Sequence, residues 1–125
     1  MNEDWCIKTA TSIAESFDLT TEVKFKHDLI DQGIYSIDEN TIYLNDNIIN
    51  TVSEIEFFKI VLHEINHAMY CRDMGADAFK SDYELEMERC IVADLEPYFD
   101  NYYERKAEEF AEEHYENCHN LWSYK

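Results

Sequence analysis

The sequence predicts a single α+β domain in which an N-terminal helix is followed by three short strands and then by further helices. Two observations predict this class. Gly occurs only twice and Pro once in 125 residues, and so few turn-forming residues favour long helices over an all-β architecture. Only residues 21–45 show the alternation of apolar and polar residues that is typical of strands. The length fits one compact domain, so we expect residues 1–125 to form a single unit.

The strands are expected early in the chain. TEVKF, residues 21–25, alternates and predicts a first short strand. In GIYSIDENTIYLND, residues 33–46, two alternating segments flank the turn signal Asp-Glu-Asn. We therefore expect a β-hairpin here, and a short three-stranded sheet of the antiparallel type.

Four stretches of the sequence predict helices. Residues 3–18 repeat apolar side chains at helical spacing. SEIE at the start of residues 53–72 and SDYE at the start of residues 81–96 are capping boxes, in which Ser and Glu satisfy the first free N–H groups of a helix. Gly75 can supply the break between these two helices. A last helix is expected over residues 98–122.

The charge and the cysteines narrow the classes of function. A net charge of −18 repels nucleic-acid phosphates, which argues against direct DNA or RNA binding, and it attracts basic partners. The four cysteines form no CxxC pair, the N-terminal residues lack a secretory signal, and no apolar run is long enough for a membrane span. We expect a cytoplasmic monomer with reduced cysteines and no membrane association.

The stretch VLHEINHAMY, residues 61–70, contains an HExxH motif. Residues four apart project from the same side of a helix, so His63 and His67 can reach one metal ion. Glu64 points away from the ligand positions but can touch a water on the metal. HExxH zinc peptidases divide the work in this way between two ligands and one general base.

A catalytic zinc needs a third protein ligand, and the last expected helix offers two candidates. Glu104 and Glu108 share a helical stripe with Ala107 and Ala111, and these small residues would let this helix approach the histidines closely. Glu104 could then complete a His–His–Glu site, while Glu108 accepts a hydrogen bond from a ligand histidine. The spacing leaves open which of the two glutamates is the ligand. Cys71 lies about 12 Å along the helix from His63, too far to share its ion.

The chain resembles the ImmA/IrrE-type metallopeptidases, a gluzincin-like group, over roughly residues 33–115. ERKAEEFA, which starts at Glu104, is similar to the family pattern E-x-x-A-[DN]-x-F-A, with Glu108 in place of Asp or Asn. The resemblance implies a zincin-like fold, with His63, His67 and Glu104 as zinc ligands and Glu64 as the base. It also implies a minimal metallopeptidase domain. Members of the group are often linked to cleavage of transcriptional repressors, so the resemblance implies a substrate of this kind. The long segment between His67 and Glu104 departs from the family pattern.

Together these features predict a zinc-dependent endopeptidase that cleaves a basic protein, such as a transcriptional repressor or another nucleic-acid-associated factor. The acidic residues Glu84, Glu86 and Glu88 offer a candidate docking face for it. The alternative is a non-enzymatic acidic binding protein with a structural or vestigial metal site, which explains the charge but not the motif. A purely structural zinc would leave Glu64 without a task.

Overall fold

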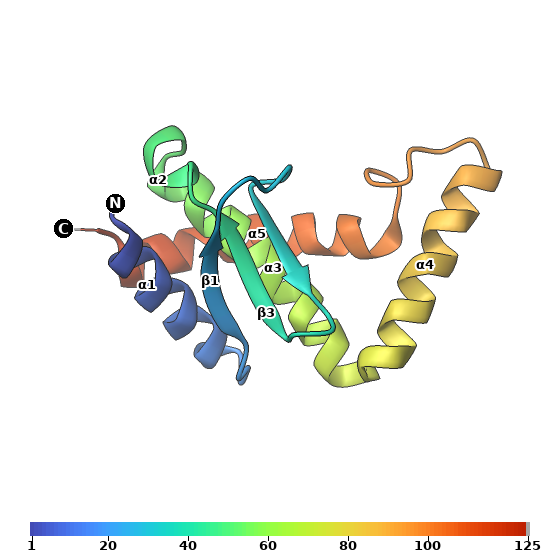
Figure 1. Ribbon diagram of the computed structural model, residues 1–125, viewed down its shortest axis with the longest axis horizontal. Helices are drawn as coiled ribbons and strands as arrows, with labels where there is room; N and C mark the ends of the chain where they lie inside the picture. The colour runs from blue at the N-terminus through green and yellow to red at the C-terminus, as the bar shows by residue number, and fades with distance from the viewer. Residues whose placement is uncertain (125) are drawn as a thin grey trace.

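The computed structural model describes residues 1–124, and its α+β architecture confirms the expected fold class. Figure 1 shows the elements in chain order, with the start of α1 near the end of α5. The short helix α2 was not expected, because its four residues are too few for a helical period. The elements are α1 (Glu3–Ser16), β1 (Glu22–Lys26), β2 (Gly33–Ser36), β3 (Thr41–Asn45), α2 (Ile48–Thr51), α3 (Glu54–Met74), α4 (Ala76–Val92) and α5 (Tyr102–Trp122).

The three strands form one mixed sheet in the order β1-β3-β2. β2 pairs with β3 in antiparallel fashion, as the hairpin signal predicts, whereas β1 pairs with β3 in parallel. The expectation of a sheet that is antiparallel throughout is therefore wrong for β1. β1 lies beside β3 and not beside β2, because β3 takes the central place, where its side chains Ile42 and Leu44 are completely buried. As a result, β2 becomes an edge strand.

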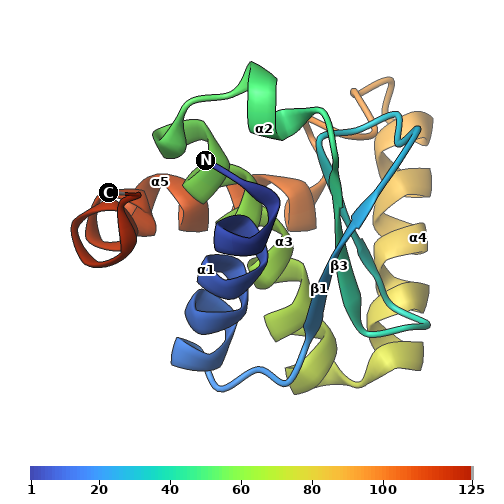
Figure 2. The same ribbon diagram turned by 60° about the vertical axis from the view of Figure 1, so that its left-hand side comes forward.

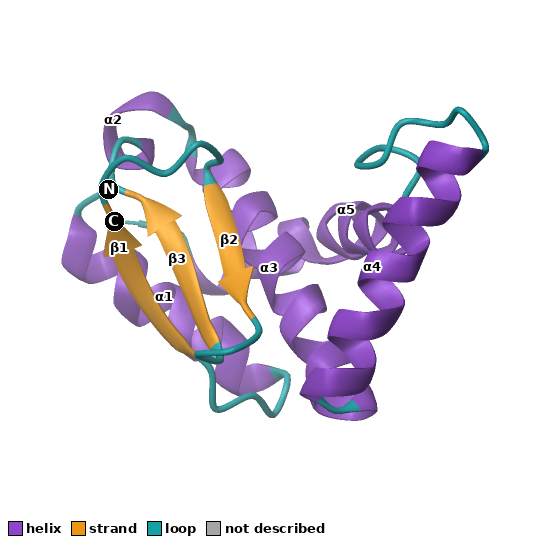
Figure 3. Ribbon diagram, turned by 45° about the vertical axis from the view of Figure 1, so that its right-hand side comes forward, coloured by secondary structure: helices purple, strands orange, loops and turns teal. Residues whose placement is uncertain are grey.

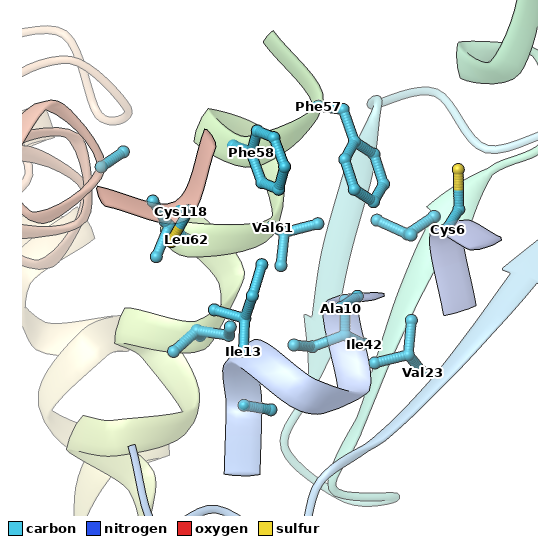
Figure 4. Packing of buried hydrophobic residues seen from close by; sticks show 14 of the residues in the cluster. Cys6, Ala10, Ile13, Val23, Ile42, Phe57, Phe58, Val61, Leu62 and Cys118 are labelled. Carbon is cyan, nitrogen blue, oxygen red and sulfur yellow. The ribbon is translucent and has the colours of Figure 1, made fainter. Parts of the chain in front are cut away.

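The main core lies between the sheet and three of the helices. Figure 4 shows apolar side chains from α1, β1, β3, α3 and α5 meeting in one cluster. Phe57 and Phe58 of α3 are completely buried there and pack against Trp5 of α1, with ring centroids 5.3 and 6.1 Å apart. Burying an aromatic side chain contributes about 1.5–3 kcal/mol. This packing fixes the position of α3, which carries the HExxH motif.

The capping box at the start of α3 is confirmed. Ser53 is the N-cap and its hydroxyl accepts a hydrogen bond from the backbone N–H of Glu56. Gly75, at a φ of 92°, ends α3 as expected, because glycine tolerates positive φ without a steric penalty.

The second predicted capping box is wrong. α4 begins at Ala76, directly after Gly75, so Ser81 lies inside the helix rather than at its start. The residues just before Ser81 include two alanines and a lysine, which are good helix formers. Nothing therefore delays the helix until Ser81. The last helix also starts later than expected, since Asn101 caps α5 through the N–H groups of Tyr103 and Glu104.

The helix α4 stands apart from the main core, beside the edge strand β2. Figures 1 and 3 show α3 and α5 behind the space between β2 and α4, and Figure 2 shows α1 and α3 against one face of the sheet. A second apolar cluster, centred on Cys71, Phe79 and Tyr103, joins α4 to its neighbours. Within residues 1–124, no helix combines the length and apolar character needed to cross a membrane.

Candidate metal centre

The two histidines of the motif lie on the side of α3 that faces α5 and the second cluster. His63 and His67 are 6% and 7% exposed, and their ring centroids are 5.0 Å apart. The buried stripe of α3 packs into the main core next to them. The rings are therefore held by packing on both sides of the helix, which suits a site that must have a fixed geometry.

Glu104 reaches these histidines from the first turn of α5. The buried side chain of Asn101 accepts the backbone N–H of Glu104 and so sets the start of the helix. Ala107 is completely buried and Ala111 is 2% exposed, so small side chains line the contact between α5 and α3. This close approach brings Glu104, itself only 5% exposed, into the histidine pair.

The three side chains converge on one point. One carboxylate oxygen of Glu104, Oε1, lies 2.8 Å from Nε2 of His63 and 2.9 Å from Nε2 of His67. The three potential ligand atoms all lie within 4.8 Å of one another. Two imidazole nitrogens and one carboxylate oxygen are a donor set typical of zinc and other divalent transition metals. These residues could therefore hold a metal ion.

Glu108 and Tyr83 contact this group from outside. Oε1 of Glu108 lies 2.9 Å from Nδ1 of His63, the nitrogen that faces away from Glu104. The hydroxyl of Tyr83, from α4, donates a hydrogen bond to Oε2 of Glu104. Each contact occupies the second polar atom of a candidate ligand, and such contacts orient metal ligands and strengthen metal binding. In this arrangement Glu104 is one of the three candidate ligands, and Glu108 orients the ring of His63.

We expect Tyr83→Phe to weaken zinc binding about 10- to 100-fold, the usual effect of removing a hydrogen bond to a metal ligand. The ring remains, but Oε2 of Glu104 loses its donor and the carboxylate can rotate. The measurement is a competition titration with a chromophoric chelator. Tyr102→Phe, in an exposed position on α5, is the control. Equal zinc affinity of the Tyr83→Phe and wild-type proteins would contradict the positioning role.

Glu64 lies beside the three candidate ligands and faces the edge strand. Burial raises its pKa to about 7, and the nearby charges of Glu104 and Asp31 add to this effect, while His67 and His63 oppose it. A carboxyl group with a pKa near neutrality can both accept and release a proton at physiological pH. Gly33 of β2 packs closely against α3, since an added Cβ would lie 3.1 Å from Ile60 Cγ2 and in ordinary contact with Glu64 Cγ at 3.5 Å.

Tyr98 completes the surroundings of the centre from the loop between α4 and α5. Its hydroxyl is 3.4 Å from Nε2 of His63, and the two rings stack with their centroids 6.3 Å apart. Burial, together with the charges of Glu104 and Glu64, raises the pKa of Tyr98, so its phenol stays protonated and can donate a hydrogen bond. The sequence did not single out Tyr83 or Tyr98, because nothing local separates them from the other seven tyrosines.

Two hollows meet at the centre and share Gly33, His63, Glu64, Tyr98 and Asp31. One, of about 320 Å³, extends between β2 and α4. The other, of about 450 Å³, extends toward the start of α3 and the side of α5. Together they form a groove along the edge strand, and Glu64 lies where the two hollows join.

The thermal stability of the chelated protein is expected to fall from about pH 6 to about pH 9. Burial opposes the charge of His63, but its hydrogen bond to Glu104 and the neighbouring carboxylates raise its pKa from 6.5 to about 9. The contribution of protonated His63 to folding stability is complete below about pH 6.5 and is lost as the pH rises through about 9. The raised pKa of Glu64 also lowers the stability as the pH rises from 4.5 to about 7. In this pH range the folded state binds more protons than the unfolded state.

Melting temperatures measured with excess chelator across this pH range test the expectation. Zinc should reverse the trend, since it binds the deprotonated imidazole more strongly as the pH rises. His63→Gln should flatten the profile of the chelated protein. A chelated wild type that becomes more stable toward about pH 9 would contradict the assignment.

Comparison with known proteins does not identify a relative. No protein-family model matches the chain, and neither a curated protein nor a solved structure matches it. The resemblance to the metallopeptidase group therefore stays a prediction, based on the motif and the glutamate-bearing helix.

Proposed function

We propose that this protein is a zinc-dependent endopeptidase of the HExxH type. One observation carries the proposal: a buried carboxylate with a raised pKa, Glu64, lies beside a His–His–Glu group and opens into a groove at a sheet edge. A purely structural metal site would not require this carboxylate. An acidic binding protein would require neither the buried carboxylate nor the groove.

The candidate ligands are His63, His67 and Glu104. With zinc bound, the centre supplies Lewis-acid chemistry, which polarises a peptide carbonyl and makes water more acidic. Tyr83 and Glu108 hold two of the ligands in place from outside. The nitrogen and oxygen donors favour zinc over magnesium or calcium, which prefer sites made of oxygen ligands alone.

Glu64 acts as the general base and then as the general acid. It takes a proton from the attacking water, whose oxygen forms the new bond to the carbonyl carbon. It then gives the proton to the nitrogen that leaves as the C–N bond breaks. The products are a carboxyl group and a free amine, and the base is restored. In this proposal Tyr98, whose hydroxyl lies 3.4 Å from Nε2 of His63, donates a hydrogen bond to the oxygen of the cleaved carbonyl, where negative charge develops.

The edge strand β2 supports binding of an extended polypeptide. β2 has β3 on one side, and its other side faces the groove. An extended chain can add to such an edge through backbone hydrogen bonds, and this mode of binding does not depend on the side chains. Side-chain preference must then come from the rest of the groove.

We further propose a basic protein as substrate, because the charge of −18 favours encounter with positively charged partners. A transcriptional repressor or another nucleic-acid-associated protein has this property. A cytoplasmic location is supported by the four cysteines, which are buried and free of disulfides. We propose that the chain acts as a monomer.

The test is incubation of the purified chain with a proteome-derived peptide mixture, followed by identification of new termini by mass spectrometry. Cleavage is expected with zinc, is lost on chelation and returns when zinc is restored. The Glu64→Gln protein loaded with zinc serves as the control for contaminating proteases. If the zinc-loaded wild type produces no more new termini than this control, the peptidase function is rejected.

A further inference from the structure

The two ends of the groove differ in chemistry. The hollow between β2 and α4, called here the aromatic arm, is lined beyond the shared centre by Ile34, Tyr35, Ile37, Phe79 and Tyr83. Phe79 is 2% exposed and packs against Tyr83 and Tyr103 of the second cluster. A wall that is already packed needs no rearrangement to receive an apolar side chain.

The other hollow, called here the acidic arm, carries three carboxylates besides that of Glu64: those of Asp31, which lines both hollows, Glu56 and Glu108. They come from the loop before β2, the first turn of α3 and the middle of α5. Lys59 is the one Lys or Arg among the lining residues of this hollow. Its ammonium group is bound to Glu112 at 2.9 Å and lies over the ring of Tyr115, so it does little to neutralise the arm.

The position of Asp31 is fixed by the sheet. The side chain of Asn45, at the end of β3, donates hydrogen bonds to the backbone carbonyls of Leu29 and Asp31 at 2.9 and 3.3 Å. Asn45 is only 7% exposed, so this anchor is shielded from water. The backbone that carries Asp31 is thereby held at the mouth of the groove before a ligand arrives.

Glu64 supplies a second and independent sign that the groove holds a ligand. It is 7% exposed, lines both hollows and makes no side-chain hydrogen bond with any of residues 1–124. A buried carboxylate without a partner costs stability, and the groove is the direction from which a partner can reach it.

We propose that the groove selects an extended peptide with a bulky apolar side chain on the N-terminal side of the cleaved bond and a Lys or Arg on the C-terminal side. This inference rests on the proposed peptidase function. The order follows from antiparallel addition to β2, the slightly more stable pairing. The aromatic arm lies at the C-terminal end of β2, near Ile37, and the acidic arm lies at its start, near Gly33.

This assignment places the recognition of basic residues in the groove, and not on the docking face that the sequence predicts at Glu84, Glu86 and Glu88 of α4. Glu86, one of the three glutamates of that predicted docking face, has a side chain that is only 15% exposed, pairs with Arg89 and accepts the backbone N–H of Tyr102. The negative charge of Glu86 is therefore partly neutralised within the protein. Asp31 has no such ion pair in residues 1–124, and it lines the hollow next to Glu64.

The test uses synthetic peptides that contain Phe or Ala on the N-terminal side and Lys, Gln or Glu on the C-terminal side, and a set in which the Phe–Lys order is reversed. Cleavage by the zinc-loaded wild type is measured as kcat/KM. Binding of fluorescent versions to zinc-loaded Glu64→Gln protein is measured separately. The variants are Asp31→Asn and Glu56→Gln for the acidic arm, Ile37→Ala for the aromatic arm and Glu88→Gln as the control.

The preference for Lys over Gln should fall roughly two- to fivefold for each carboxylate removed, and the fall should shrink at high salt. Ile37→Ala should reduce the preference for Phe over Ala and leave the preference for Lys unchanged. Each comparison is a ratio within one variant, so a general loss of activity or of folded protein cancels. Glu88→Gln should change neither ratio.

Four outcomes separate the two proposals. Cleavage and binding that both favour Phe before Lys support both. Cleavage without this preference, or with the reversed order, overturns the specificity and leaves the peptidase function. Binding with the preference but no cleavage supports the groove assignment for a ligand and rejects the peptidase. Neither binding nor cleavage rejects both.

Discussion

Glu64→Gln is expected to lower kcat/KM about 10²- to 10⁴-fold, the usual contribution of a general base, while zinc content stays unchanged. The amide has nearly the same shape as the carboxylate but cannot accept a proton from water. Glu64 lies beside the candidate ligands but outside the group that converges on one point. Its replacement should therefore leave metal binding intact.

The stability of this variant provides a second readout. Because burial raises the pKa of Glu64 to about 7, the ionised carboxylate is costly above that pH, and the neutral amide avoids this cost. The metal-free variant should be at least as stable as the metal-free wild type at about pH 8. Glu109→Gln, exposed on α5, is the matched control and should keep both activity and stability. Wild-type rates in the zinc-loaded Glu64→Gln protein would reject the mechanism.

The residues predicted from helical spacing are brought together, because spacing along one helix is a local property. The HExxH pattern places His63 and His67 on one side of α3 whatever the rest of the chain does. The pairing with Glu104 required a further signal, the small residues Ala107 and Ala111, which indicate a close contact with another helix. Each of these patterns lies within a single helix, so each can be recognised in the sequence without knowledge of the fold.

The features that the sequence did not reveal depend on contacts between distant segments. β1 lies beside β3 because the most apolar strand takes the centre of the sheet, and a hairpin signal does not report the position or the direction of a third strand. The start of α4 was misplaced because the pattern at Ser81 is a valid capping box that the preceding helix formers override. Tyr83 and Tyr98 reach the centre only through the path of α4 and its following loop.

Glu104→Gln is expected to lower zinc affinity by at least about 100-fold, more than the loss of a supporting contact would. Its Oε1 atom faces both histidine nitrogens at 2.8 and 2.9 Å. The neutral amide is a much poorer zinc ligand than a carboxylate. Elemental analysis of dialysed protein and chelator competition measure the loss.

Glu108→Gln is the decisive comparison, because the two glutamates were the competing candidates for the third ligand. Glu108 touches Nδ1 of His63, and its side chain is 65% exposed. Its replacement should weaken zinc binding only about tenfold, since it acts by orienting the ring. Glu112→Gln, one turn further along α5, should change nothing. If Glu108→Gln loses the metal while Glu104→Gln keeps it, the roles are exchanged, and α5 must turn to present Glu108 to both histidines.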